Sequence, residues 1–272
     1  MTINPRDIPA VPLDLAPWCG CPKGDESWQR ITRKFVRPSP DLLDSTGFDF
    51  AAIVDLDDWP DFATYQAAVK RTHKGSALRH ARKSDRAGYY CKPFPWRRHV
   101  PDAHEINTSK EIRCGKPMRP GYLTPIDKMG GYPNDRTPTE FVPGPCPLHH
   151  FIPWGVFQPV KPYFQGTVQT DEQLLAYIKF KRIGEMALYT QILGHGDYLA
   201  DGIMYRLHLA IMEWMLDPAR DHREITDGIR YIVYAQYFCG NRGLRQWKKK
   251  LLFQPARLYQ DPKRIGGAED AA

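Results

Sequence analysis

The chain has 272 residues, a length that suits one large domain or two small ones. Apolar residues make up 42% and charged residues 25%, which excludes an intrinsically disordered chain and predicts a folded core. The net charge of +7 favours an anionic partner such as nucleic acid, a phosphorylated cofactor or an acidic surface. The sequence shows no hydrophobic leader, and no apolar run approaches the ~20 residues of a membrane helix. We therefore expect a cytoplasmic protein without a membrane partner.

The six cysteines are scattered, and only Cys19 and Cys21 are close in sequence. This C-x-C pair has no second C-x-x-C or histidine pair at zinc spacing to complete it. The sequence interpretation is therefore reduced thiols and no bound metal.

The N-terminal residues 1–46 are rich in proline and polar residues, which predicts an irregular arm packed on a domain. Residues 47–56 have alternating and then continuous apolar residues, the pattern of a strand. We expect the folded domain to span residues 47–260 and a flexible tail to span 261–272.

A helix is predicted to begin near Asp61, with one apolar face and one basic face. The basic face continues to Arg86, is opposed only by Asp85, and has a break at Gly75 and Ser76. The candidate phosphate-contacting residues are Lys70, Arg71, Arg79, Arg82 and Lys83. Two interpretations remain open here, a solvated helix face or a nucleic-acid-binding face.

The middle of the chain combines a strand, a polar stretch and a long loop. Residues 88–94 read as a strand, whereas 104–115 have too many polar residues for a core element and predict a short helix from Thr108 or Ser109. Residues 117–148 form a long proline- and glycine-rich loop, of a length that is usually functional or mobile.

The second half predicts a strand meander followed by a helical crossover. Strands are expected at 154–158, 173–180 and 187–193, then a helix at 203–215 with an apolar core-facing stripe, and a strand at 229–235. This order predicts an α+β fold with a mixed sheet.

A glycine turn precedes the 203–215 helix, with Gly194, Gly196 and Gly202 as its glycines. Helix N-termini bind phosphates, and glycine lets the backbone approach a ligand closely. The same glycines also suit an ordinary strand-to-helix turn, so both interpretations remain open.

The order of elements resembles the GCN5-related N-acetyltransferase (GNAT) fold, most closely at residues 154–255, and within it the FemAB-like branch. Three stretches carry the resemblance: the basic helix 70–86 followed by Gly88, the turn 194–202, and the segment 241–255 with its asparagine, aromatic–lysine pair and phenylalanine. The resemblance implies a mixed, mostly antiparallel central sheet flanked by helices. The chain departs from the usual pyrophosphate loop, because Asp201-Gly202 has no arginine or glutamine in register.

This resemblance implies an N-acyltransferase that moves an acyl or aminoacyl group from acyl-CoA or aminoacyl-tRNA to an amine acceptor. In the family a splayed strand pair lends a backbone N–H to the carbonyl. The residues implied for donor binding are Gly194, His195, Gly196, Gly202, Ile203 and Asn241.

Acyl transfer to an amine needs a base and a donor to the developing oxyanion. The candidate catalytic residues are His104, Glu105 and Tyr189, and the candidate substrate-pocket residues are Asn107, Ser109, Arg113 and Gln191. The alternatives are a hydrogen-bonded loop organiser at 104–113, a non-enzymatic nucleic-acid-binding protein using the basic helix, or a fold that has lost its chemistry.

Overall fold

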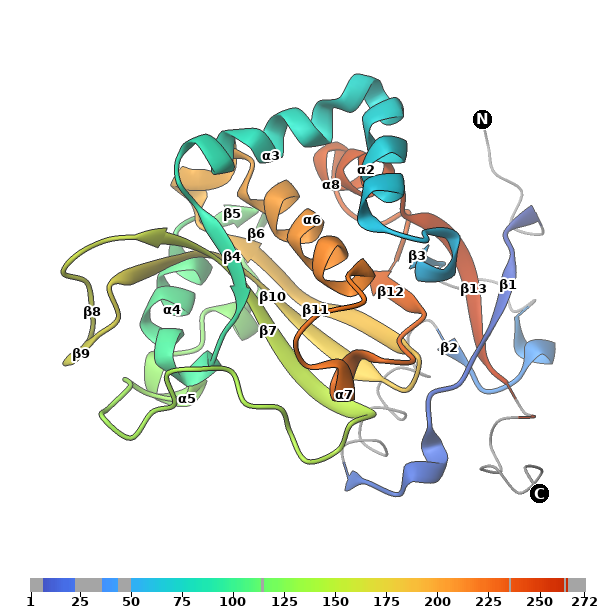
Figure 1. Cartoon of the computed structure of the whole chain (residues 1–272), viewed down its shortest axis with the longest axis horizontal. Coiled ribbons are helices and arrows are strands. Elements are labelled where there is room, and N and C mark those ends of the chain that lie inside the picture. Colours follow the sequence, from blue (N-terminus) through green and yellow to red (C-terminus); the bar gives the residue numbers. More distant parts are fainter. Residues whose placement is uncertain are drawn as a thin grey trace.

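The computed structural model describes residues 7–22, 36–43, 50–113, 115–234, 236–261 and 263. Its centre is a mixed sheet in the order β1-β13-β3-β12-β11-β10-β7-β4, with β2 beside β13 (Figure 1). The pairs β11–β12, β1–β13 and β2–β13 are parallel and the others in this sheet are antiparallel. The strands are β1 Ala10–Leu13, β2 Val36–Arg37, β3 Ala51–Asp55, β4 Tyr90–Pro93, β7 His149–Pro159, β10 Glu172–Ile183, β11 Met186–Gly194, β12 Tyr231–Tyr234 and β13 Gln254–Gln260. The expected α+β class with a mostly antiparallel mixed sheet is confirmed.

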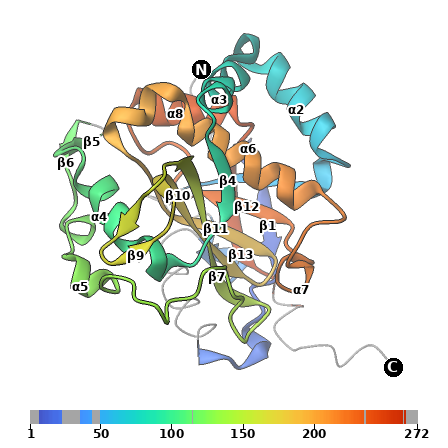
Figure 2. The same ribbon diagram turned by 60° about the vertical axis from the view of Figure 1, so that its left-hand side comes forward.

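Helices cover both faces of this sheet. The helices are α2 Phe62–Arg71, α3 Ser76–Arg86, α4 Val100–Thr108, α5 Ile126–Met129, α6 Ile203–Leu216, α7 Arg223–Thr226 and α8 Arg242–Lys250. Helices α2, α3, α6 and α8 lie on one side and α4 on the other (Figures 1 and 2). The predicted apolar stripe of α6 packs in the main core, where Leu207 and Ile211 are fully buried.

The predicted basic helix is two helices. Asp61 caps α2 by accepting a hydrogen bond from the Thr64 N–H at 2.7 Å. The chain then turns through His73, Lys74 and Gly75, all with positive φ, before α3 begins. The break therefore falls where Gly75 and Ser76 predicted it.

Two expected elements need correction. The N-terminal arm is not wholly irregular, because residues 10–13 form β1 and pair in parallel with β13. Helix α4 occupies residues 100–108 and ends at Thr108, where the sequence predicted a helix to start. Its face of Val100, Ala103 and Ile106 is buried, and this face explains the helix despite the polar residues around it. Residues 47–49 of the predicted strand 47–56 lie outside the described part of the chain.

A β-bulge at Thr190 divides β11 into two halves. Lys179 pairs with Gln191, whereas the next residue of β10, Phe180, pairs with Tyr189. Because one extra residue stands in β11, side chains before and after it point to opposite faces. Tyr189 packs in the core on the α6 side, whereas Leu193 packs in the core on the α4 side.

A buried ionic network lies between α4 and β10. His99 Nδ1 is 3.4 Å from Asp102 Oδ2, and His99 Nε2 is 3.3 Å from Glu172 Oε1. Lys92 Nζ is 2.8 Å from Glu172 Oε2, and the Tyr90 hydroxyl donates to the same carboxylate. Burial raises the pKa of Glu172, but hydrogen bonds from His99, Lys92 and Tyr90 outweigh burial and hold the pKa at about 2.

This network predicts acid lability. The pKa of Glu172 is lower in the folded chain than its ordinary value of 4.5, so its ionised form stabilises the fold above pH 4.5. That contribution, about 3 kcal/mol, is lost as the pH falls from 4.5 towards 2. Urea unfolding measured from pH 2 to 6 tests this expectation. Glu172→Gln should flatten the profile, whereas Glu140→Gln, at an exposed position, should leave it unchanged.

Candidate functional site

Strand β11 extends further than β12, the strand that pairs with it in parallel. Its pairing with β12 ends at Tyr189 opposite Tyr234, whereas its pairing with β10 continues to Gly194 opposite Ala176. Within the described residues, the β12-side edge of 190–193 therefore has no strand beside it. This is the arrangement in which a backbone N–H is available to a ligand carbonyl.

A pocket of about 220 Å³ lies beside this part of β11, on the α4 side. Lys179 and Gln191 contribute its floor as opposed residues of β10 and β11. The remaining lining residues are Trp96, Asn107, Gly121, Thr124, Lys128 and Met129. The bulge at Thr190 is what turns Gln191 towards this pocket.

Lys179 is a chemically distinct group in the pocket. Its Nζ lies 3.7 Å from the centroid of the Trp96 ring, within cation–π distance. Burial lowers the pKa of Lys179 to about 8, so both the ammonium and the free amine are populated near neutral pH. Nearby, Asn107 accepts a hydrogen bond of 2.6 Å from the Tyr177 hydroxyl, which fixes the amide in the wall.

Competitive amine labelling tests the state of Lys179. With acetic anhydride and peptide mass spectrometry, labelling of Lys179 should rise with a midpoint near pH 8. Lys161, whose side chain is 77% exposed, serves as the internal control. A Lys179 midpoint equal to that of Lys161 would contradict the buried-amine assignment.

The end of α4 is clamped onto the predicted glycine turn. Arg113 Nη1 donates to the Gly194 carbonyl at 2.9 Å, and Nη2 donates to Ser109 Oγ at 3.0 Å. Ser109 Oγ in turn accepts from the Gly196 N–H at 2.9 Å. The structure thus brings the predicted donor turn and the predicted substrate residues together, but Ser109 and Arg113 hold the turn and are not free pocket groups.

A carboxylate–histidine pair sits beside this clamp. His195 Nε2 is 3.6 Å from Glu105 Oε1, while His195 Nδ1 accepts from the Asp197 N–H at 3.3 Å. These partners assign the proton to Nε2, which points to Glu105. Glu105 is exposed. His104, one residue earlier, is half-buried.

The structure contradicts the catalytic assignment of Tyr189. Its hydroxyl is buried and 2.9 Å from His208 Nδ1, on the α6 side of the sheet and away from Gln191. Burial raises its pKa well above the ordinary value, so the hydroxyl stays protonated. In an unbroken strand, Tyr189 and Gln191 would lie on the same face of the sheet. The bulge at Thr190 places them on opposite faces, so the prediction for Tyr189 is wrong.

Gly202 and Ile203, which the sequence assigned to donor binding, have packing roles in the structure. Gly202 has a φ of +78°, and a β-carbon there would overlap the His80 carbonyl oxygen of α3. Ser84 Oγ donates to the Asp201 carbonyl at 2.7 Å, which closes the contact between α3 and the turn. Ile203 is fully buried. Gly202 therefore serves helix packing, because α3 lies where a β-carbon at this position would stand.

The terminal segment that resembles the acyltransferase family is structural. Asn241 Oδ1 accepts from the Leu244 N–H at 2.9 Å and caps α8, so its predicted donor contact is replaced by a helix cap. Trp247 and Phe253 are buried in the core. Lys248 is 1% exposed and donates to the carbonyls of the preceding 236–239 turn, so it does not belong to a surface basic cluster.

The predicted basic face is exposed. Lys70, Arg71, Arg79, Arg82 and Lys83 all lie on the outer surface of α2 and α3. Lys83 Nζ also donates to the Ala200 carbonyl at 3.2 Å, so the face adjoins the turn before α6.

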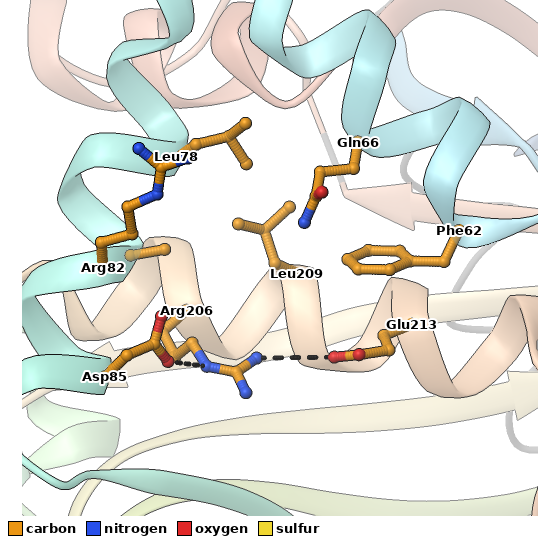
Figure 3. A pocket seen from close by; sticks show the side chains of 9 residues that line it. Phe62, Gln66, Leu78, Arg82, Asp85, Arg206, Leu209 and Glu213 are labelled. Carbon is orange, nitrogen blue, oxygen red and sulfur yellow. Dashed lines mark hydrogen bonds and ion pairs between the residues drawn. The ribbon is translucent and has the colours of Figure 1, made fainter.

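A second pocket, of about 240 Å³, lies between α2, α3 and α6 (Figure 3). Three of its charged groups pair with one another: Arg206 Nε is 2.7 Å from Asp85 Oδ1, and Arg206 Nη1 is 3.8 Å from Glu213 Oε2. Of the residues predicted from sequence, only Arg82 lines it. It does not gather the groups that acyl transfer requires.

Sequence reasoning missed Lys179 and Trp96. A signal was available for Lys179, because it is the one charged residue within the predicted apolar strand 173–180. For Trp96 there was none, because its contact with Lys179 depends on the path of the chain between β4 and α4.

Comparison with protein-family models and with curated proteins finds no match. Among solved structures, the chain is similar to one described as the "C-terminal Domain (DUF2156) of Putative Lysylphosphatidylglycerol Synthetase from Agrobacterium fabrum". The likeness has a TM-score of 0.41 and 13% identity, and it covers 85% of this chain and 71% of that one. A likeness of this size carries no inference about activity. No helix within the described residues is long and apolar enough to cross a membrane.

Proposed function

We propose that this protein transfers an aminoacyl or acyl group to an amine acceptor at the Lys179 pocket. The observation that carries the proposal is the pocket itself, which lies beside the stretch of β11 that pairs with no residue of β12 in the described part of the chain. The resemblance to acyltransferases implies a carbonyl held at such a splayed strand pair.

Each group of the site has a proposed role. The Lys179 ammonium and the free edge of β11 stabilise the oxyanion that develops on the donor carbonyl. Gln191 and Asn107 hydrogen-bond the acyl group, and Glu105, oriented by His195, removes a proton from the attacking amine. Truncation of Lys179 to alanine should lower kcat/KM by about 10²–10³-fold.

The pH dependence follows from the pKa of Lys179. Because the protonated form stabilises the oxyanion, kcat should fall as the pH rises through about 8. In Lys179→Arg the side chain stays charged, so the alkaline fall should move out of the accessible range while some activity remains. A wild-type rate that rises steadily to pH 10 would contradict this role.

We propose aminoacyl-tRNA as the donor in preference to acyl-CoA. Two contacts of the turn before α6 support this preference: α3 packs against Gly202, and Ser109 Oγ accepts from the Gly196 N–H, which is then not available to a pyrophosphate. The five exposed cations of α2 and α3 suit a long polyanion, and Lys83 and Ser109 contact the same 196–201 turn from the two sides of the molecule.

Donor binding separates these possibilities. Filter binding of labelled aminoacyl-tRNA should weaken steeply with salt, and Arg79→Glu with Arg82→Glu should weaken it further. Lys161→Glu, on an exposed loop, is the matched control. Tight binding of acyl-CoA without binding of tRNA would reject this donor, and binding of neither by the folded chain would reject the proposed function.

A non-enzymatic nucleic-acid-binding protein is the second candidate, favoured by the same exposed basic face. This second function predicts equal affinity for tRNA with and without an aminoacyl group. In that case Lys179→Ala would leave both affinity and the fate of the aminoacyl ester unchanged.

A further inference from the structure

Four side chains of the types that bind metals meet at the β10–β11 hairpin, at the opposite end of β11 from Gly194. Cys19 and Cys21 come from the N-terminal segment, Cys146 precedes β7, and His149 begins β7 opposite Ile183 of β10. Their three Sγ atoms and His149 Nδ1 all lie within 4.8 Å of one another. The C-x-C pair that lacked a partner in the sequence thus meets a C-x-x-H pair from 125 residues further along the chain.

The spacing of these atoms fits a tetrahedral ion. His149 Nδ1 is 3.0 Å from Cys19 Sγ, 3.4 Å from Cys21 Sγ and 3.7 Å from Cys146 Sγ. Zinc bonds of ~2.3 Å to sulfur and ~2.0 Å to nitrogen place these atoms about 3.6 Å apart at the tetrahedral angle. The three observed distances lie around that value.

The tautomer of His149 supports the same assignment. Its Nε2 is 3.0 Å from the Leu15 carbonyl oxygen, which only accepts hydrogen bonds. Nε2 therefore carries the proton, and Nδ1 presents a lone pair to the three sulfurs. The single lone pair of Nδ1 can accept one well-aligned S–H hydrogen bond. Three sulfur atoms nevertheless lie within 3.7 Å of it. A cation bound to all four atoms accounts for the convergence, and the Leu15 carbonyl is the outer partner that a ligating histidine usually has.

We propose that Cys19, Cys21, Cys146 and His149 bind one Zn²⁺ ion in a closed structural site. Three thiolates and one imidazole in tetrahedral arrangement are a ligand set that selects zinc. Four protein ligands leave no position for water or substrate, so the ion holds the fold and takes no part in catalysis.

The ion would fasten the N-terminal segment to the sheet. Next to the cluster, Asp14 and Glu185 exchange hydrogen bonds of 2.9 Å, the Asp14 N–H donating to Glu185 Oε1 and the Glu185 N–H to the Asp14 carbonyl. A β-carbon at Gly184 would overlap the Asp14 carbonyl, so the segment passes directly over the hairpin. Zinc would join two parts of the chain that are distant in sequence, residues 19–21 and 146–149.

Metal analysis of the full chain, purified without chelator, tests the proposal. Inductively coupled plasma mass spectrometry should find about one zinc per chain. Cys146→Ser and His149→Ala should each lose it, whereas Cys239→Ser, at an exposed thiol outside the cluster, should retain it. Replacement by Co²⁺ should give the thiolate charge-transfer and intense d–d bands of tetrahedral cobalt.

Three outcomes would overturn the site. The first is a folded wild-type chain that contains no zinc and shows no tetrahedral Co²⁺ spectrum after reduction and reconstitution. The second is a disulfide between two of the three cluster cysteines in freshly purified protein. The third is full zinc content in both Cys146→Ser and His149→Ala. If those variants do not fold, the wild-type Co²⁺ titration alone decides.

Discussion

Gly202→Ala is expected to prevent stable folding or to lower the free energy of unfolding by about 4–5 kcal/mol, the exceptional end of single substitutions. Two costs add at this position. A φ of +78° strains any residue with a β-carbon, by about 1–2 kcal/mol. The new β-carbon would also overlap the His80 carbonyl oxygen, so α3 must shift away from the turn before α6. Urea denaturation followed by circular dichroism measures the change.

Gly88→Ala is the matched control. Gly88 has a similar φ of +76°, but a β-carbon there meets nothing within 4 Å. It should therefore show the backbone strain alone, about 1–2 kcal/mol. Equal effects of the two substitutions would contradict the packing role of Gly202. A stable Gly202→Ala that has selectively lost donor binding would instead restore the phosphate-binding role that the sequence suggested.

Asp102→Ala should cost about 3–5 kcal/mol, because it removes one partner from a buried charged network. The carboxylate accepts from the Tyr163 hydroxyl at 2.6 Å and from the Leu174 N–H at 2.8 Å, and it lies beside His99. All three groups lose an acceptor at once, and the Leu174 N–H belongs to a buried residue of β10. Thermal unfolding and urea unfolding should give the same decrease in the free energy of unfolding.

Asp102→Asn separates charge from hydrogen bonding at this site. The amide oxygen can still accept from Tyr163 or Leu174, so the loss should be smaller than for alanine, with the remainder due to the missing charge beside His99. Equal losses for both variants would indicate that the charge alone matters. No loss for either would contradict the network.

The general architecture could be predicted from sequence because its signals are local. The apolar runs of β10, β11 and β12 and the stripe of α6 follow from periodicity, and Asp61 and Gly75 mark a helix start and a break. The mixed sheet follows from the order of these elements.

The site was less predictable because it depends on one inserted residue and on distant contacts. The bulge at Thr190 places Tyr189 and Gln191 on opposite faces of the sheet, and no pattern in residues 187–193 predicts a bulge there. Gly202 was assigned to a ligand because it lies in a glycine turn before a helix, and Asn241 because the segment 241–255 resembles the acyltransferase family. In the fold, the His80 carbonyl and the end of α8 occupy those positions. Conversely, Glu105 and His195 were chosen separately and lie 3.6 Å apart.

The cysteines show the same limit. Cys19 and Cys21 have no second C-x-x-C or histidine pair at the spacing of common zinc motifs. The C-x-x-H of Cys146 and His149 was visible in the sequence, but only the fold brings the two pairs together.

Acceptor-dependent loss of the aminoacyl group from aminoacyl-tRNA tests the central claim most directly. The full chain, a mixed pool of labelled aminoacyl-tRNAs and a panel of primary amines should release deacylated tRNA and a labelled amide faster than any control. Lys179→Ala should lower this rate by about 10²–10³-fold, while Lys161→Ala should not change it. A folded protein that transfers no label from aminoacyl-tRNA or from acyl-CoA, or one in which Lys179→Ala is fully active, would contradict the account.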